Sequence, residues 1–163
     1  MIAADAIRFL APRLGVDEPS LRTVDRALAT SGLREKASGR YHPDVSTEEL
    51  LRLVIGIVAA RHKTEAAGVV QEIEGATFTS TEPHQLPDDV LKAQTGLTRA
   101  DLSDATLLSV LSSVCHFLAE PGAGDDLVRR PKPFLEVSSI FPPALCFDGG
   151  TIHFMRASNA LPE

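Results

Sequence analysis

Three residues, Gly15-Val16-Asp17, separate two stretches of the chain whose apolar residues have helical spacing. Glycine takes the positive-φ conformation that ends a helix at no steric cost. Asp17 is a suitable N-cap for a second helix, because its carboxylate can accept a hydrogen bond from a free N–H group of the first turn. The pattern therefore predicts two short helices that cross at a tight turn.

Apolar residues on both sides of this turn are spaced for contact between the helices. Ala11 lies where the second helix would cross the first, and Val16 would fill the angle between them. Leu21, Val24 and Leu28 repeat at steps of three and four residues, which predicts the buried stripe of the second helix. Pro12 falls inside the first helix, at a cost of roughly 3 kcal/mol in a regular helix, so we expect a kink or a separate turn there.

Residues 10–28 resemble the helix-turn-helix of bacterial and phage DNA-binding regulators, through the spacing of Ala11, Gly15, Val16 and Leu21. The resemblance implies that the second helix enters the major groove of double-stranded DNA. The outer residues of this helix, which would then contact DNA, are Ser20, Arg22, Thr23 and Arg26. The two arginines could bond guanine edges or phosphates. The alternative is an ordinary hairpin of two helices, in which the glycine only connects them.

A loop with two glycines follows at residues 32–43. Its basic residues Arg34, Lys36 and Arg40 could contact DNA phosphates from a mobile arm whose end Tyr41 anchors. A solvated linker would have the same composition, and we keep both interpretations.

The segment that begins at Ser46 has the sequence of a capping box, with Glu49 three residues after the Ser46 N-cap. Residues 50–60 are then apolar on nearly every side. This run is too short to span a bilayer, so it predicts a core helix or a helix at a subunit interface. Because such a helix is hard to cover in a chain of this size, we expect a homodimer or a higher homo-oligomer.

The second half begins with weaker helical signals. Residues 64–73 suggest a short helix interrupted by Gly68, and residues 74–86 have the composition of a loop. Pro87 and Gly96 mark the first residue and the end of a further helix. Residues 103–120 have a broad apolar face and predict the strongest helix of this half.

The periodicity changes to two residues near the C-terminus, which predicts strands at 134–141, 144–147 and 151–156. Asp148-Gly149-Gly150 would form a tight reversal, and Ile152 and Phe154 would share one face of the last strand. We expect a three-stranded antiparallel sheet packed on the helix at 103–120. The fold class is therefore mainly α with a small antiparallel sheet (α+β), divided into residues 1–64 and 65–163.

The charge is distributed unevenly, since residues 1–64 contain ten Lys/Arg and eight Asp/Glu, whereas residues 65–163 contain six and fourteen. A slightly basic front suits nucleic-acid binding, and the acidic C-terminal half could bind another protein, although an acidic half is most often a soluble surface. The absence of a leader or apolar span predicts a cytoplasmic protein without membrane contact. Cys115 and Cys146 fit buried thiols of a reducing compartment.

Catalytic patterns are lacking in the sequence. The five histidines have no metal-ligand spacing to either cysteine, and the acidic pairs Asp88-Asp89 and Asp125-Asp126 fall at a helix start and in a loop. We therefore expect no enzymatic activity, metal or cofactor. The sequence favours a small bacterial or phage DNA-binding protein, either a transcriptional regulator or a DNA-packaging adaptor. The alternative is a non-enzymatic interaction module, or a phage accessory or inhibitor protein, that binds another protein.

Overall fold

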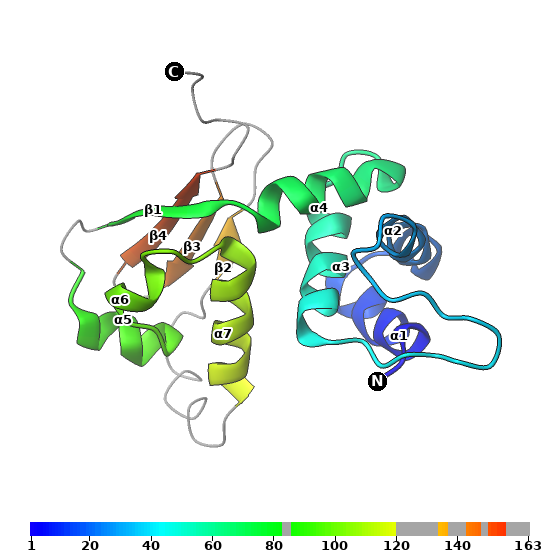
Figure 1. Ribbon diagram of the computed structural model, residues 1–163, viewed down its shortest axis with the longest axis horizontal. Coiled ribbons are helices and arrows are strands. Elements are labelled where there is room, and N and C mark those ends of the chain that lie inside the picture. Colours follow the sequence, from blue (N-terminus) through cyan, green and yellow to red (C-terminus); the bar gives the residue numbers. More distant parts are fainter. Residues whose placement is uncertain (83–85, 120–133, 137–142, 148–149, 156–163) are drawn as a thin grey trace. The chain divides into compact units, whose positions relative to one another are not determined.

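The computed structural model describes residues 1–82, 86–119, 134–136, 143–147 and 150–155 (Figure 1). The chain divides into two compact units, Met1–Gln71 (unit 1) and Glu72–Glu163 (unit 2). The mainly α fold class with a small antiparallel sheet is confirmed. None of the described helices combines the length and the apolar character needed to cross a membrane.

Unit 1 consists of helices. Their bounds are α1 Ala3–Leu14, α2 Glu18–Thr30, α3 Thr47–Ala59, the 3₁₀ helix η1 Lys63–Glu65 and α4 Ala66–Glu74, of which α4 continues into unit 2. α2 packs against α1, α3 and η1. Its predicted stripe is confirmed, since Leu21, Val24 and Leu28 are fully buried.

The turn between α1 and α2 has the predicted geometry. Gly15 has a φ of 65° and a ψ of 30°, and its N–H bonds the carbonyl of Ala11. The Asp17 side chain caps α2 by accepting a 2.7 Å hydrogen bond from the Ser20 N–H. α1 is one helix through Pro12, so residues 11–14 are not a separate turn. Pro12 is exposed and lies in the last turn, where its ring does not disturb the buried face.

α3 begins at the predicted capping box, in which the Ser46 and Glu49 side chains each accept a hydrogen bond from the other residue's N–H group. α3 is only partly enclosed. Leu53, Ile55 and Ile57 are buried, whereas Val58 is 64% exposed. The helix at 64–73 is not interrupted by Gly68, which lies within α4.

The units meet at Gln71 and Glu72 rather than after residue 64. The reason is the packing of α4 against α3. Gly56 of α3 is close to Ala66 and Val70 of α4, so that a Cβ at Gly56 would lie 3.3 Å from a Val70 methyl. The first turns of α4 therefore belong to the core of unit 1.

Unit 2 contains helices and one sheet. The bounds are β1 Thr77–Glu82, α5 Asp88–Thr95, α6 Arg99–Leu102, α7 Leu107–Ala119, β2 Phe134–Glu136, β3 Ala144–Phe147 and β4 Gly150–Met155. The sheet is antiparallel with the strand order β1-β4-β3-β2. Ile152 and Phe154 of β4 are fully buried, as the alternation predicts.

The sheet has four strands, and the three-stranded prediction is wrong. β1 lies inside residues 74–86, which we expected to form a loop. β1 pairs with β4 across the whole of β1, from Thr77 opposite Met155 to Glu82 opposite Thr151. The Phe78 N–H also donates to the Ala105 carbonyl, and the Leu107 N–H donates to Ala76. These bonds attach β1 to the segment that enters α7.

The helices of unit 2 also differ in detail from the predictions. The expected helix at 103–120 begins only at Leu107, because α6 and a turn precede it. Pro87 is the N-cap of α5 rather than its first residue, and Gly96 ends α5 as predicted. The end of the strand predicted to reach residue 141, the reversal at 148–149 and the pair Asp125-Asp126 lie outside the described residues.

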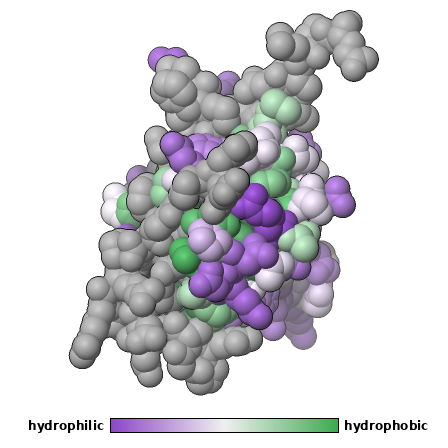
Figure 2. All heavy atoms as spheres, turned by 90° about the vertical axis from the view of Figure 1, so that its left-hand side faces the viewer, coloured by the Kyte–Doolittle hydropathy of each residue, from purple (hydrophilic) through white to green (hydrophobic). Residues whose placement is uncertain are grey.

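Figure 2 looks toward the side of Figure 1 that carries α5 and α6, where hydrophilic and apolar residues are interspersed over the described surface. The exposed acidic residues of this region also have local structural roles. Asp101 accepts a 2.7 Å bond from the Thr98 N–H at the start of α6, and Asp88 accepts a 3.1 Å bond from the Arg99 N–H. Asp88 and Asp101 thus stabilise the α5–α6 connection.

Candidate nucleic-acid interface

The outer face of α2 carries the residues that sequence analysis assigned to DNA contact. Arg22, Thr23 and Arg26 are exposed, and the two arginines lie one helical turn apart. The opposite face of α2 is fully buried, so the helix is fixed while its outer side chains stay in solvent. This is the arrangement that a helix inserted into a groove requires.

The polar side chains of these residues differ in the hydrogen bonds and ion pairs that they form. The Ser20 hydroxyl is half-buried at the start of α2 and donates to the Asp17 carboxylate over 2.9 Å. The Thr23 hydroxyl donates to the Pro19 carbonyl within the helix. Arg22 forms an exposed 3.2 Å ion pair with Glu18, of the kind that contributes little to stability. Arg26 has no hydrogen bond or ion pair with the described part of the chain.

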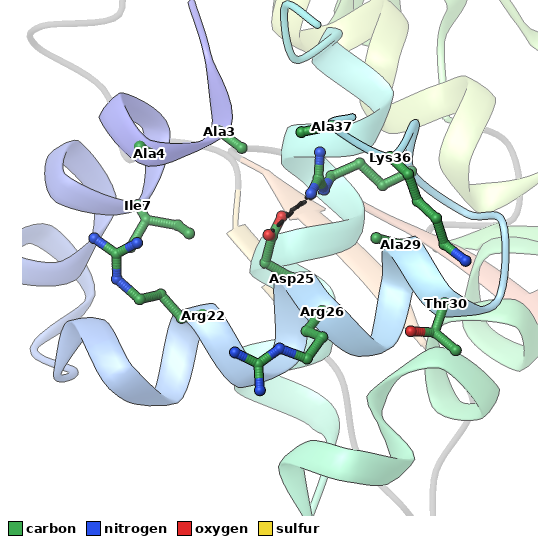
Figure 3. A pocket seen from close by; sticks show the side chains of 11 residues that line it. Ala3, Ala4, Ile7, Arg22, Asp25, Arg26, Ala29, Thr30, Lys36 and Ala37 are labelled. Carbon is green, nitrogen blue, oxygen red and sulfur yellow. Dashed lines mark hydrogen bonds and ion pairs between the residues drawn. The ribbon is translucent and has the colours of Figure 1, made fainter. Parts of the chain in front are cut away.

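A hollow of about 420 Å³ opens on one side of α2, between α1, α2 and residues 34–37 (Figure 3). We call it the α1–α2 pocket. Arg22, Arg26, Arg34 and Lys36 all line it, so it brings together four of the predicted contact residues. A second hollow of about 380 Å³ is lined by residues that include Thr23, Arg26 and Thr64. Arg26 lines both hollows.

Arg34 differs from the other cations because its side chain is only 9% exposed. Its Nε lies 2.5 Å from Asp25 Oδ1, and its Nη2 donates to Asp25 Oδ2 over 3.0 Å. Figure 3 shows Asp25 among the residues that line the pocket, and Arg34 Nη1 donates to the Glu35 carbonyl over 2.7 Å. Burial raises the pKa of Asp25, and the charge of Arg34 offsets part of that rise. Arg34 thus holds residues 34–35 against α2, and it is not an exposed phosphate contact.

The segment that follows is tied to the rest of unit 1. Ser38 and Tyr41 exchange backbone hydrogen bonds of 3.1 and 2.9 Å around a tight turn that contains Gly39 and Arg40. The Glu35 N–H donates to Glu49 Oε1 over 2.8 Å, and the N-terminal amine forms a 2.6 Å ion pair with Asp44. Arg40 is exposed on this turn and does not line either hollow. Hydrogen bonds and an ion pair therefore fix this loop to the rest of unit 1, and its composition did not predict them.

The groups that could carry other chemistry are the histidines, the cysteines and the acidic residues. Among the described residues, no three His, Cys, Asp or Glu side chains gather where they could hold a metal ion. Cys115 and Cys146 are free thiols of intermediate exposure, and burial raises the pKa of Cys115. His153 lies 3.3 Å from Glu82 at the surface of unit 2.

Burial of the basic residues in ion pairs with Asp25 or Glu35 would favour the interaction-module alternative, and Arg34 forms such a pair with Asp25. Asp25 is adjacent to the buried Val24 and points away from the outer face, but no periodicity reveals its partner nine residues later. Comparison with known proteins supplies no further evidence: no protein-family model, curated protein or solved structure matches this chain.

Proposed function

We propose that unit 1 binds double-stranded DNA through the outer face of α2, in a small bacterial or phage regulator or DNA-packaging adaptor. The observation that carries this proposal is the pair Arg22 and Arg26, exposed one turn apart on a helix whose inner face is buried. Lys36 lines the same hollow and adds a third cation beside the helix. Arginine forks suit guanine edges and phosphates alike.

A gel-shift assay against genomic fragments, at two stated salt concentrations, tests the proposal directly. Arg22→Ala and Arg26→Ala should each weaken specific binding by about 1–3 kcal/mol, because a base-edge or phosphate contact is lost. Lys36→Ala should weaken binding to all sequences alike and flatten its salt dependence, because it would meet only phosphate. Arg8→Ala is the matched control, since Arg8 is exposed on α1 and does not line either hollow.

Two variants are unsuitable for this test. Leu21→Ala removes buried packing, and Arg34→Ala leaves the Asp25 carboxylate without its partner. Both would reduce DNA binding through loss of folding. If the parent protein binds no DNA at low salt, or if folded Arg22→Ala and Arg26→Ala proteins keep the parent's affinity, DNA binding by α2 is refuted.

The second candidate is a protein-interaction module. It is favoured by the Asp25–Arg34 pair, since an arginine held in a buried ion pair serves the fold rather than a nucleic acid. For both candidate functions, we assign self-association or the binding of a partner protein to residues 72–163 and to the exposed side of α3. The acidic residues of unit 2 would favour a basic protein surface.

A further inference from the structure

The α1–α2 pocket has features of a ligand site that go beyond a flat DNA-binding face. We propose that it binds the phosphate group of an anionic ligand. The volume of about 420 Å³ lies within the range of small-molecule pockets. The proposal stands whether or not unit 1 binds DNA, because a phosphate group reaches the pocket either on a DNA backbone or on a free small molecule.

Small side chains keep this pocket open. Ala3 and Ala4 of α1, Ala29 of α2 and Ala37 of the following segment contribute only methyl groups to its lining, and Ile7 adds one larger apolar surface. These positions belong to helices and to a segment tied to α2, so the space between them does not depend on a mobile loop.

The charges that line the pocket are unbalanced. Arg34 neutralises Asp25, the carboxylate among the lining residues, which leaves Arg22, Arg26 and Lys36 as excess positive charge. Arg26 and Lys36 have no polar partner within the described ranges. The exposed bond that Arg22 donates to Glu18 is weak and is easily exchanged for a stronger one. In Figure 3 Arg22 and Arg26 leave α2 at successive turns, and Lys36 lies on the other side of Asp25 with its ammonium group turned away from the two arginines.

Phosphate suits this arrangement better than a carboxylate does. Its oxygens point in several directions and carry up to two charges, so they can bond guanidinium forks and an ammonium group that approach from different sides. The Asp25–Arg34 pair prepares the site, because the bond from Arg34 to the Glu35 carbonyl fixes the backbone next to Lys36.

The test is an NMR titration of the full chain with inorganic phosphate at constant ionic strength. We expect saturable shifts of the Ala3, Ala29 and Ala37 amides. Arg26→Gln and Lys36→Gln should each weaken the affinity about tenfold, the usual effect of losing one charge-assisted bond. The control Arg8→Gln should leave it unchanged, because Arg8 is exposed on α1 but outside the pocket. Shifts that do not saturate, or an equal loss in Arg8→Gln, overturn the proposal.

Competition then distinguishes the two sources of phosphate. If a mixed-sequence DNA duplex displaces inorganic phosphate, the pocket holds a backbone phosphate. If phosphate binds saturably while DNA does not bind, the DNA-binding function fails and the pocket stands as a site for a free phosphorylated compound. If DNA binds and inorganic phosphate does not, the pocket proposal alone is refuted.

Discussion

Two arginines in the same pocket, Arg26 and Arg34, have opposite roles. The side chain of Arg34 is nearly buried against Asp25, and that of Arg26 extends into solvent. Burying a charge is costly unless an opposite charge and hydrogen bonds replace its water. Arg34 has both, so removing it would leave an uncompensated carboxylate. An identical residue type therefore serves the fold at one position and is available for binding at the other.

We predict that Arg34→Met lowers the free energy of unfolding of unit 1 by about 3 kcal/mol, as expected when one partner of a buried pair is removed. Arg26→Met should change it by less than about 0.5 kcal/mol, since an exposed side chain without a partner is lost. Urea unfolding followed by circular dichroism measures both. The double variant Asp25→Leu/Arg34→Met should recover part of the loss, and equal effects of the two single variants would contradict the assignment.

Glu49 provides a pH-dependent contact at the start of α3. Burial alone would raise its pKa, but hydrogen bonds from the Ser46 and Glu35 N–H groups outweigh burial and hold the pKa below 4.5. A lowered carboxylate pKa stabilises the folded state above the unfolded pKa, and this stability is lost as the pH falls through the folded value.

We therefore predict that Glu49→Gln destabilises the protein by about 1 kcal/mol near neutral pH, because glutamine has one acceptor oxygen and loses one of the two hydrogen bonds. The difference from the parent should shrink as the pH falls below the ordinary glutamate pKa and through the lowered pKa of Glu49, where the folded parent becomes protonated. Thermal unfolding between about pH 3 and pH 7 measures this. Glu48→Gln is the control. The Glu48 side chain is exposed, and the bond from the Glu35 N–H goes to Glu49 instead. A pH-independent difference would exclude the proposed bonds.

At the scale of elements, the clearest signals in the sequence were the residues that cap or end helices. The Gly15 turn, the Asp17 cap and the Ser46 capping box were all predicted and are confirmed. β1 was missed although Thr77, Phe78, Thr79 and Thr81 are residue types that favour strands. The glycine and proline on either side of β1 suggested a loop, and its partner β4 is about seventy residues away in the sequence.

The turn between α1 and α2 gives a test at this scale. Gly15→Ala should lower the free energy of unfolding by about 1 kcal/mol, because alanine pays for the left-handed conformation at φ 65° even though the space around it is open. Gly68→Ala should raise it by about 0.5–1 kcal/mol, because Gly68 is helical, without a positive φ, and equally open. Denaturant midpoints measure both. The same sign for the two variants would mean that the turn is not left-handed.

At the scale of the whole molecule, self-association is the main expectation. α3 is an apolar helix that unit 1 covers only in part, and Val58 is 64% exposed. Leu51 and Val54 are half-buried at the helical spacing that leads to Val58, so an apolar stripe of α3 reaches the surface and could form an interface.

We predict a homodimer or higher homo-oligomer in light scattering at tens of micromolar protein. Val58→Gln should shift the mass toward the monomer without loss of helical content, because Val58 contributes little to the core of its own chain. The matched control is Val69→Gln, a half-buried position on α4. A monomeric parent at this concentration would contradict the expectation.

The sequence by itself determined the features that depend on neighbouring residues. Helix ends, buried stripes and the face of β4 follow from backbone conformation and periodicity, which act over a few residues. Only the tertiary structure decided which cations are free and which are buried, that β1 completes the sheet, and that Arg22, Arg26 and Lys36 line one pocket. These results depend on contacts between residues far apart in the chain, and the burial of a charge is defined only once the surrounding elements have packed.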